Sequence, residues 1–199
     1  AAGMAAKEVA ATAPLLVIVY QRIFLTSSWK ELFNRFKGLN AGLALTWIIP
    51  VILLSQTTEY AKSAGFLYKG FSTWQYALTQ PGVVLHYLKL SVWPTALCLD
   101  YFWMPARHFN VIFFPLAVIL VLIGWTFLQL KKNSPLGFLG VWFFVILSVS
   151  SSFIPIQDIA FEHRMYLSLA AVVMIVLLIV ESGLNRFVGQ PVKEKILVG

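Results

Sequence analysis

The residues best suited to chemistry lie close together in the C-terminal third of the chain. Four ionisable residues occupy seven positions between two long apolar runs: Asp158, Glu162, His163 and Arg164. Ionisable groups at the edge of a bilayer are expensive to hold there and usually mark a site or a buried ion-pair network. An arginine fork binds phosphate, a histidine moves a proton near neutral pH, and a carboxylate accepts a proton from a hydroxyl. We interpret this loop as the candidate site, with Glu162 or Asp158 as weak catalytic candidates.

The same residues also admit a purely structural interpretation. Glu162 would lie near the positive end of a helix dipole, and Arg164 would pair with Asp158. The chain has three histidines, whose scattered spacing does not match a metal site: His86, His108 and His163. We predict no metal and no cofactor, and the sequence leaves the functional and structural interpretations of the loop open.

Composition indicates the class of protein that these residues belong to. Of the 199 residues, 59% are hydrophobic and only 12% are charged, and the mean hydropathy is +0.81. A soluble domain of this length cannot cover itself with so few charges, so the composition predicts a membrane protein. The net charge is +7, but the basic residues lie between apolar runs and form no continuous patch, which argues against nucleic-acid binding. The single Cys98 excludes an internal disulfide and a cysteine-built metal site.

Five apolar runs approach the ~20 residues that a membrane-spanning helix needs. They cover residues 9–25, 39–54, 111–130, 136–155 and 166–180. Backbone groups in lipid must pair internally, and five runs cannot close a barrel, so each run is predicted to be a helix. We therefore expect an all-α integral membrane protein, with residues 1–199 forming one polytopic domain of about five transmembrane helices.

A long connection, residues 55–110, separates the second run from the third. Residues 79–82 would cap a helix over residues 83–93 that Pro94 ends. This helix is too short to cross a bilayer, so we predict that it is amphipathic and lies in the membrane interface. Helical spacing places His86, Lys89 and Trp93 on one face and Leu85, Leu88 and Val92 on an apolar face. Six aromatic residues fit an interfacial belt: Trp74, Tyr76, Tyr87, Tyr101, Trp103 and Phe109.

The distribution of lysine and arginine predicts how the spans are oriented. The connections after the first, third and fifth runs have net charges of +3, +2 and +1, which places all three in the cytoplasm. The long connection and the loop over residues 157–164 then lie on the opposite side. A set of charged residues would gather with that loop at one non-cytoplasmic edge: Lys7, Glu8, His86, Lys89, Asp100 and Arg107. Such a pocket beside lipid suits a substrate with an anionic head and an apolar tail.

Several short strings, in order along the chain, resemble one protein family. They are Lys7-Glu8, Tyr20-Gln21-Arg22, Thr79-Gln80-Pro81-Gly82, Cys98-Leu99-Asp100-Tyr101, residues 137–144, and the string from Ala160 through Glu162-His163-Arg164-Met165-Tyr166 to Leu167. The family comprises bacterial membrane proteins carrying tetratricopeptide repeats, which are similar to the animal transmembrane and tetratricopeptide-repeat O-mannosyltransferases. The Glu-His-Arg-Met-Tyr string is the most specific part of the resemblance.

The resemblance implies part of a GT-C-type glycosyltransferase in the bacterial inner membrane. Such an enzyme transfers a sugar from a polyprenyl-phosphate carrier to a protein hydroxyl on the non-cytoplasmic side. This agrees with the pocket predicted from topology, where we expect the substrate-binding residues to be Arg164, His163, Lys7, Glu8, His86, Lys89 and Asp100. The family's catalytic acidic loop would precede Ala1 and its repeats would follow Gly199, so the chain would be an internal fragment. Gln21 stands where we expect an acidic residue.

A competing interpretation belongs to another class. A non-catalytic integral membrane subunit would pack against a larger membrane complex and hold lipid, and its partners would be its neighbours in that complex. A transporter is a third interpretation, although broken helices around a charged midplane pocket are not evident in the sequence.

Overall fold

The computed structural model describes residues 8–56, 70–95, 97–98, 101–106, 108–151 and 153–188, and its regular elements in these ranges are helices. The N-terminal part contains η1 (Glu8–Thr12), α2 (Ala13–Tyr20), η2 (Gln21–Leu25), α3 (Trp29–Arg35), α4 (Lys37–Leu45) and α5 (Ile48–Gln56). The C-terminal part contains α7 (Thr73–Val92), α8 (Phe109–Lys131), α9 (Pro135–Ser148), η3 (Glu162–Met165) and α10 (Tyr166–Val188). Three predicted site residues, Lys7, Asp100 and Arg107, lie outside the described residues, and the side chain of Glu8 does so too.

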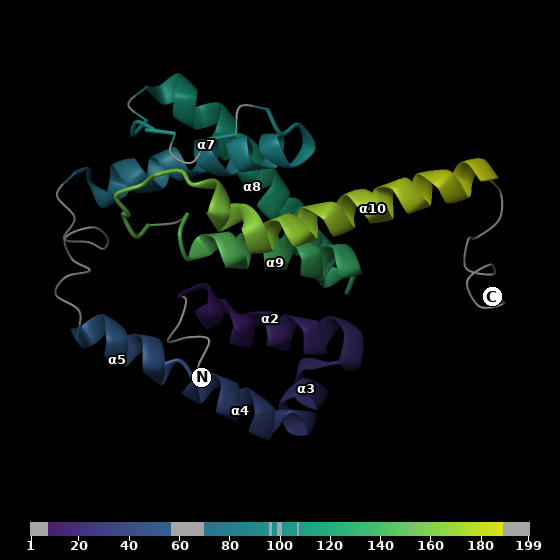
Figure 1. Ribbon diagram of the computed structural model, residues 1–199. Coiled ribbons are helices and arrows are strands. Elements are labelled where there is room, and N and C mark those ends of the chain that lie inside the picture. Colours follow the sequence, from purple (N-terminus) through teal and green to yellow (C-terminus); the bar gives the residue numbers. More distant parts are fainter. Residues whose placement is uncertain are drawn as a thin grey trace.

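Helix α9 lies at the centre of the fold, where it contacts α8, α10 and α2 (Figure 1). Helix α7 packs on α8 on the far side from α2, and α3 to α5 form the outer edge below α2 in this view. The buried core is shared by α7, α8, α9, the loop before η3, and α10. The candidate loop is therefore positioned by the packed C-terminal helices rather than by α2 to α5.

Helices α8 and α9 form a tight hairpin because small residues allow their backbones to approach closely. A Cβ atom at Gly137 would lie 2.6 Å from the backbone nitrogen of Leu130. At Gly140 it would overlap the side chain of Thr126. Asn133 takes a positive φ of 50° in the turn, a conformation that asparagine tolerates better than most residues. Small residues at contact positions are typical of helices that associate in membranes.

In the part of the chain that the structure describes, two helices are long and apolar enough to cross a membrane: Phe109–Lys131 and Glu162–Asn185. They contain the predicted spans over residues 111–130 and 166–180. The first predicted span, residues 9–25, is helical throughout but bends by 114° into α3, and this bent pair counts as a third candidate if it is one span. Two or three spans are thus supported by length and composition.

The other two predicted spans form shorter apolar helices, over Lys37–Ile52 and Pro135–Ser148. Helix α9 stops at Ser148, seven residues before the predicted end at residue 155. The reason is local hydrogen bonding, because the backbone N–H groups of Ser150 and Ser151 both turn back to the carbonyl of Leu147. The Ser148 hydroxyl also donates to the carbonyl of Val145 at 2.7 Å, and serine side chains that hydrogen-bond to nearby backbone groups in this way favour helix ends.

The prediction for residues 83–93 was wrong about where the helix begins and which face is buried. Helix α7 has 20 residues and starts at Thr73, behind a capping box between Ser72 and Gln75, with Pro81 inside it. Its buried face carries Tyr76, Gln80, Val83, Val84 and Tyr87, whereas Val92, assigned to the apolar face, is 71% exposed. A proline can lie inside a helix when tertiary packing outweighs the lost hydrogen bond. Helix α7 is therefore part of the buried core. The prediction that it is too short to cross a bilayer was wrong, because it has 20 residues.

Candidate functional site

The loop between α9 and η3 is held by two tyrosines of α7. The Tyr76 hydroxyl donates a hydrogen bond to the carbonyl of Ser150 at the start of this loop. The Tyr87 hydroxyl accepts one from the backbone N–H of Phe161 at its end, at 2.7 Å. Both tyrosines are almost fully buried, with exposed fractions of 0% and 1%, so their predicted place in an interfacial aromatic belt was wrong. Eleven positions separate them on α7, which places them on one face and lets one helix hold both ends of the loop.

Glu162, at the start of η3, links this loop to a second one, which precedes α8. One carboxylate oxygen, Oε1, accepts hydrogen bonds from the backbone N–H of Cys98, at 2.8 Å, and from the hydroxyl of Tyr101. Burial, together with the hydrogen bond to the Glu162 carboxylate, raises the pKa of Tyr101 to about 12. Two donors on one oxygen favour the ionised carboxylate and make it a poor proton acceptor. The geometry therefore shows Glu162 fixing the position of the second loop, a task different from that of a general base.

His86 lies behind this contact in an aromatic setting. Its ring meets Tyr101 edge-on, with ring centroids 5.0 Å apart, and lies 5.1 Å from the ring of Trp103. The Nε2 atom is buried and has no hydrogen-bond partner among the described residues. Burial, and then the positive charge of Lys89, lower the pKa of His86, so the imidazole is neutral at pH 7. His86 supports Tyr101 in this arrangement, and Lys89 is exposed one turn further along α7.

Arg164 does not form the predicted ion pair with Asp158, which was the structural interpretation of this residue. Its Nη1 atom donates to the carbonyl of Ile159 at 3.3 Å, and its guanidinium lies 5.7 Å from the centre of the Phe161 ring. Within the described ranges the one salt bridge joins Arg35 to Glu31, far from this loop. The positive charge of Arg164 therefore lacks a carboxylate partner among the residues described, and Asp158 lies half-buried nearby in sequence.

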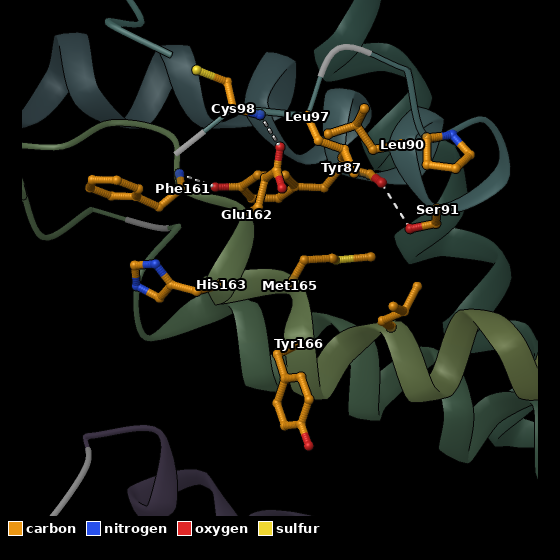
Figure 2. A pocket seen from close by; sticks show the side chains of 12 residues that line it. Tyr87, Leu90, Ser91, Leu97, Cys98, Phe161, Glu162, His163, Met165 and Tyr166 are labelled. Carbon is orange, nitrogen blue, oxygen red and sulfur yellow. Dashed lines mark hydrogen bonds between the residues drawn. The ribbon is translucent and has the colours of Figure 1, made fainter. Parts of the chain in front are cut away.

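A pocket of about 510 Å³ opens between the C-terminal half of α7, the loop after it, and the start of α10. Its wall is mostly apolar, with Glu162 as its acidic member and His163 as its basic member (Figure 2). The lining residues are Tyr87, Leu90, Ser91, Pro94, Leu97, Cys98, Phe161, Glu162, His163, Met165, Tyr166 and Leu169. Glu162 points toward Cys98 in Figure 2, whereas His163 and Tyr166 point away from Glu162. The exposed His163 ring packs at 5.1 Å from the ring of Phe161.

The structure thus brings together some of the predicted site residues and separates others. Glu162 and His163 share the pocket, whereas His86, Lys89, Asp158 and Arg164 are not part of its lining. Three tyrosines that organise the site, Tyr76, Tyr87 and Tyr101, were not recognised as such from the sequence. A buried tyrosine normally forms a hydrogen bond through its hydroxyl. The sequence does not indicate the partner in these two cases, because the partners of Tyr76 and Tyr87 are far away in sequence.

Among the described residues, no three side chains of His, Cys, Asp or Glu gather closely enough to hold a metal ion. Comparison with protein-family models, with curated proteins and with solved structures gave no match.

Proposed function

We propose that this chain is part of a membrane-embedded, glycosyltransferase-like protein that uses a polyprenyl-phosphate-linked sugar and glycosylates protein hydroxyls. The observation that carries the proposal is the mostly apolar pocket beside η3, whose acidic and basic members are Glu162 and His163. A polyprenyl phosphate has the matching chemistry, since its chain is apolar and its head is anionic and polar. Leu90, Leu97 and Leu169 line the part of the pocket suited to the isoprenoid chain.

The polar end of the donor would lie near the η3 turn. His163 lines the pocket there. Arg164, the next residue, lies outside the pocket lining, and in this proposal its positive charge, which has no carboxylate partner among the described residues, would contact the phosphate at the edge of the pocket. A guanidinium is suited to phosphate because its planar fork makes two parallel hydrogen bonds. Glu162 positions the second loop, so in this proposal the catalytic base comes from outside this chain.

The proposal includes a topology of about five spans in the bacterial inner membrane, with the pocket on the non-cytoplasmic side. The support is the alternation of positively charged connections along the sequence. Cysteines placed at Lys132 and at Asp158, in a Cys98→Ser background, would then react with an impermeant maleimide from opposite sides. Labelling of both positions from one side contradicts the topology and the shared pocket.

The central experiment measures binding of a short-chain polyprenyl-phosphate mannose to the full-length protein in nanodiscs. We expect Arg164→Lys to weaken binding by about tenfold, because the ammonium keeps the charge and loses the bidentate geometry. The thermal unfolding midpoint should change little. Lys37→Arg, a conservative change on α4 at the other end of the sequence, is the matched control and should leave binding unchanged. Unchanged binding with a lowered unfolding midpoint in Arg164→Lys would show that the residue is structural.

A second candidate function, a non-catalytic integral membrane subunit, is favoured by the exposed apolar surface of α8 and α10. Large side chains on α8 such as Phe113, Phe114 and Val121 are at least 58% exposed, and Val176 and Leu177 on α10 are about half exposed. Lipid or a neighbouring protein would cover such a surface. Stable co-purification of one partner, together with no binding of the polyprenyl-phosphate mannose, would favour this second function over the first.

A further inference from the structure

A second pocket lies at the opposite end of α8 from the candidate site. It has a volume of about 420 Å³ and is formed by the end of α2, η2, the start of α3 and the last turn of α8. The loop that brings Leu97 and Cys98 to the first pocket leads into the start of α8, whereas Lys131 of the second pocket is its last residue. A helix of 23 residues is about 34 Å long, comparable to the thickness of a bilayer core. The two pockets are therefore separate sites.

The lining of this second pocket combines two kinds of surface. Ile23, Phe127 and Leu130 provide an apolar wall, and Arg22 and Lys131 provide two positive charges. No carboxylate is among the lining residues. This combination matches a molecule with a negatively charged head and a hydrocarbon chain.

Trp29 and Arg22 contact each other in the lining of this pocket. The Arg22 guanidinium lies 5.7 Å from the centre of the Trp29 ring, and its Nη1 atom donates to the carbonyl of Thr26 at 3.3 Å. These contacts orient the guanidinium and leave further N–H groups on the same fork for a ligand. Trp29 is 53% exposed, and tryptophan is enriched where a protein meets the lipid headgroups.

The charge around the second pocket is mostly positive. Along α3, the start of α4 and the turn after α8, four further basic residues, Lys30, Arg35, Lys37 and Lys132, accompany one acidic residue, Glu31. Glu31 is engaged elsewhere, since its carboxylate accepts from the backbone N–H of Ser27 and lies 4.0 Å from Arg35. An anion bound between Arg22 and Lys131 would therefore meet attraction from its surroundings rather than repulsion.

We propose that this pocket binds an anionic phospholipid, with the headgroup phosphate between Arg22 and Lys131 and the upper acyl chain against Ile23, Phe127 and Leu130. The site lies at the end of α8 that the lysine and arginine distribution assigns to the cytoplasm, where anionic lipids attract basic residues. This assignment is independent of the function of the first pocket, because it uses different residues at the other end of α8.

The test is native mass spectrometry of the full-length chain in detergent, titrated with phosphatidylglycerol and, separately, with phosphatidylcholine. We expect a retained phosphatidylglycerol adduct, and Arg22→Ala/Lys131→Ala should weaken it by about tenfold or more. The matched control is Lys30→Ala/Lys37→Ala, which removes the same charge from the same region without touching the pocket and should change binding by less than about twofold. Equal losses in the two double variants overturn the proposal, because only general charge would then be involved.

Two further measurements test whether the bound phosphate belongs to a lipid and whether loss of binding could come from misfolding. Inorganic phosphate should not displace the lipid at millimolar concentration, since it cannot use the apolar wall; displacement would overturn the lipid assignment. Lys131→Gln, at an exposed position, should fold normally by circular dichroism and still weaken phosphatidylglycerol binding. Equal affinity for phosphatidylcholine and phosphatidylglycerol would also contradict the proposal.

Discussion

The region of α7 to α10 and the region of α2 to α5 are both helical and apolar, but they are held together differently. In the first region, the hydroxyls of Tyr76 and Tyr101 donate hydrogen bonds, and that of Tyr87 accepts one, to partners 61 to 74 residues away in sequence. In the second region the comparable long-range bond runs from the Trp47 indole to the carbonyl of Ala11, across 36 residues and at an exposed position.

This difference shows where the chain needs a defined geometry. Buried polar groups are expensive to leave without partners, so each buried tyrosine hydroxyl restricts the loop that it contacts to one arrangement. The restricted loops are those that line the first pocket. At the second pocket, the corresponding groups are charged, more exposed and oriented by Trp29, which suits a ligand held by charge and apolar contact.

The largest expected effect tests backbone packing in the two regions. Gly137→Ala places a methyl group 2.6 Å from the Leu130 nitrogen and 2.8 Å from the Gln129 carbonyl carbon. These are backbone atoms that cannot rotate away, so we expect a loss of about 1–3 kcal/mol. Gly42→Ala, in α4, meets nothing within 4 Å and should stabilise the helix by about 0.5–1 kcal/mol. Thermal unfolding in detergent measures both; a harmless Gly137→Ala would contradict the close packing of α8 and α9.

An effect of comparable size tests the buried tyrosine contacts against the exposed indole contact. Tyr87→Phe leaves the backbone N–H of Phe161 without its 2.7 Å partner, and an unsatisfied buried donor costs about 1–3 kcal/mol. Trp47→Phe removes a hydrogen bond at an exposed position, where water replaces the partner and the cost should stay near about 0.5 kcal/mol. Chemical denaturation of the two variants gives the comparison. Equal losses of unfolding free energy in Tyr87→Phe and Trp47→Phe would mean that burial does not make the first contact more important than the second.

The smallest effect concerns pH and the contact between Tyr101 and Glu162. The folded-state pKa of Tyr101 is raised to about 12, above the unfolded value of about 10. The neutral phenol is therefore favoured in the folded protein, and its contribution to stability is fully present below pH ~10 and is lost between pH ~10 and ~12. Absorbance at 295 nm, taken as the difference between wild type and Tyr101→Phe, should show this late titration. Glu162→Ala should shift the midpoint toward pH 10; an unshifted midpoint would mean that Glu162 has no influence on Tyr101.

Some features of the fold and the site followed from local sequence alone. The helical class and the long apolar helices that contain residues 111–130 and 166–180 were predictable because an uninterrupted apolar stretch is itself the signal. The closeness of Glu162 and His163 was also visible, since they are neighbours in sequence and both line the pocket, whereas Asp158 and Arg164 do not. The two basic connections that contribute Arg22 and Lys131 were evident from the same local reading.

The tertiary structure decided the rest, because it determines the partners of polar groups. The start of α7 at Thr73, the burial of Tyr76 and Tyr87, and the bond from Arg164 to Ile159 in place of Asp158 depend on surfaces formed by other helices. Tyr76 and Tyr87 each find a partner 74 residues away. Hydropathy and helical period describe a residue and its near neighbours, whereas the cost of burying a hydroxyl or a charge depends on which atoms the fold places against it.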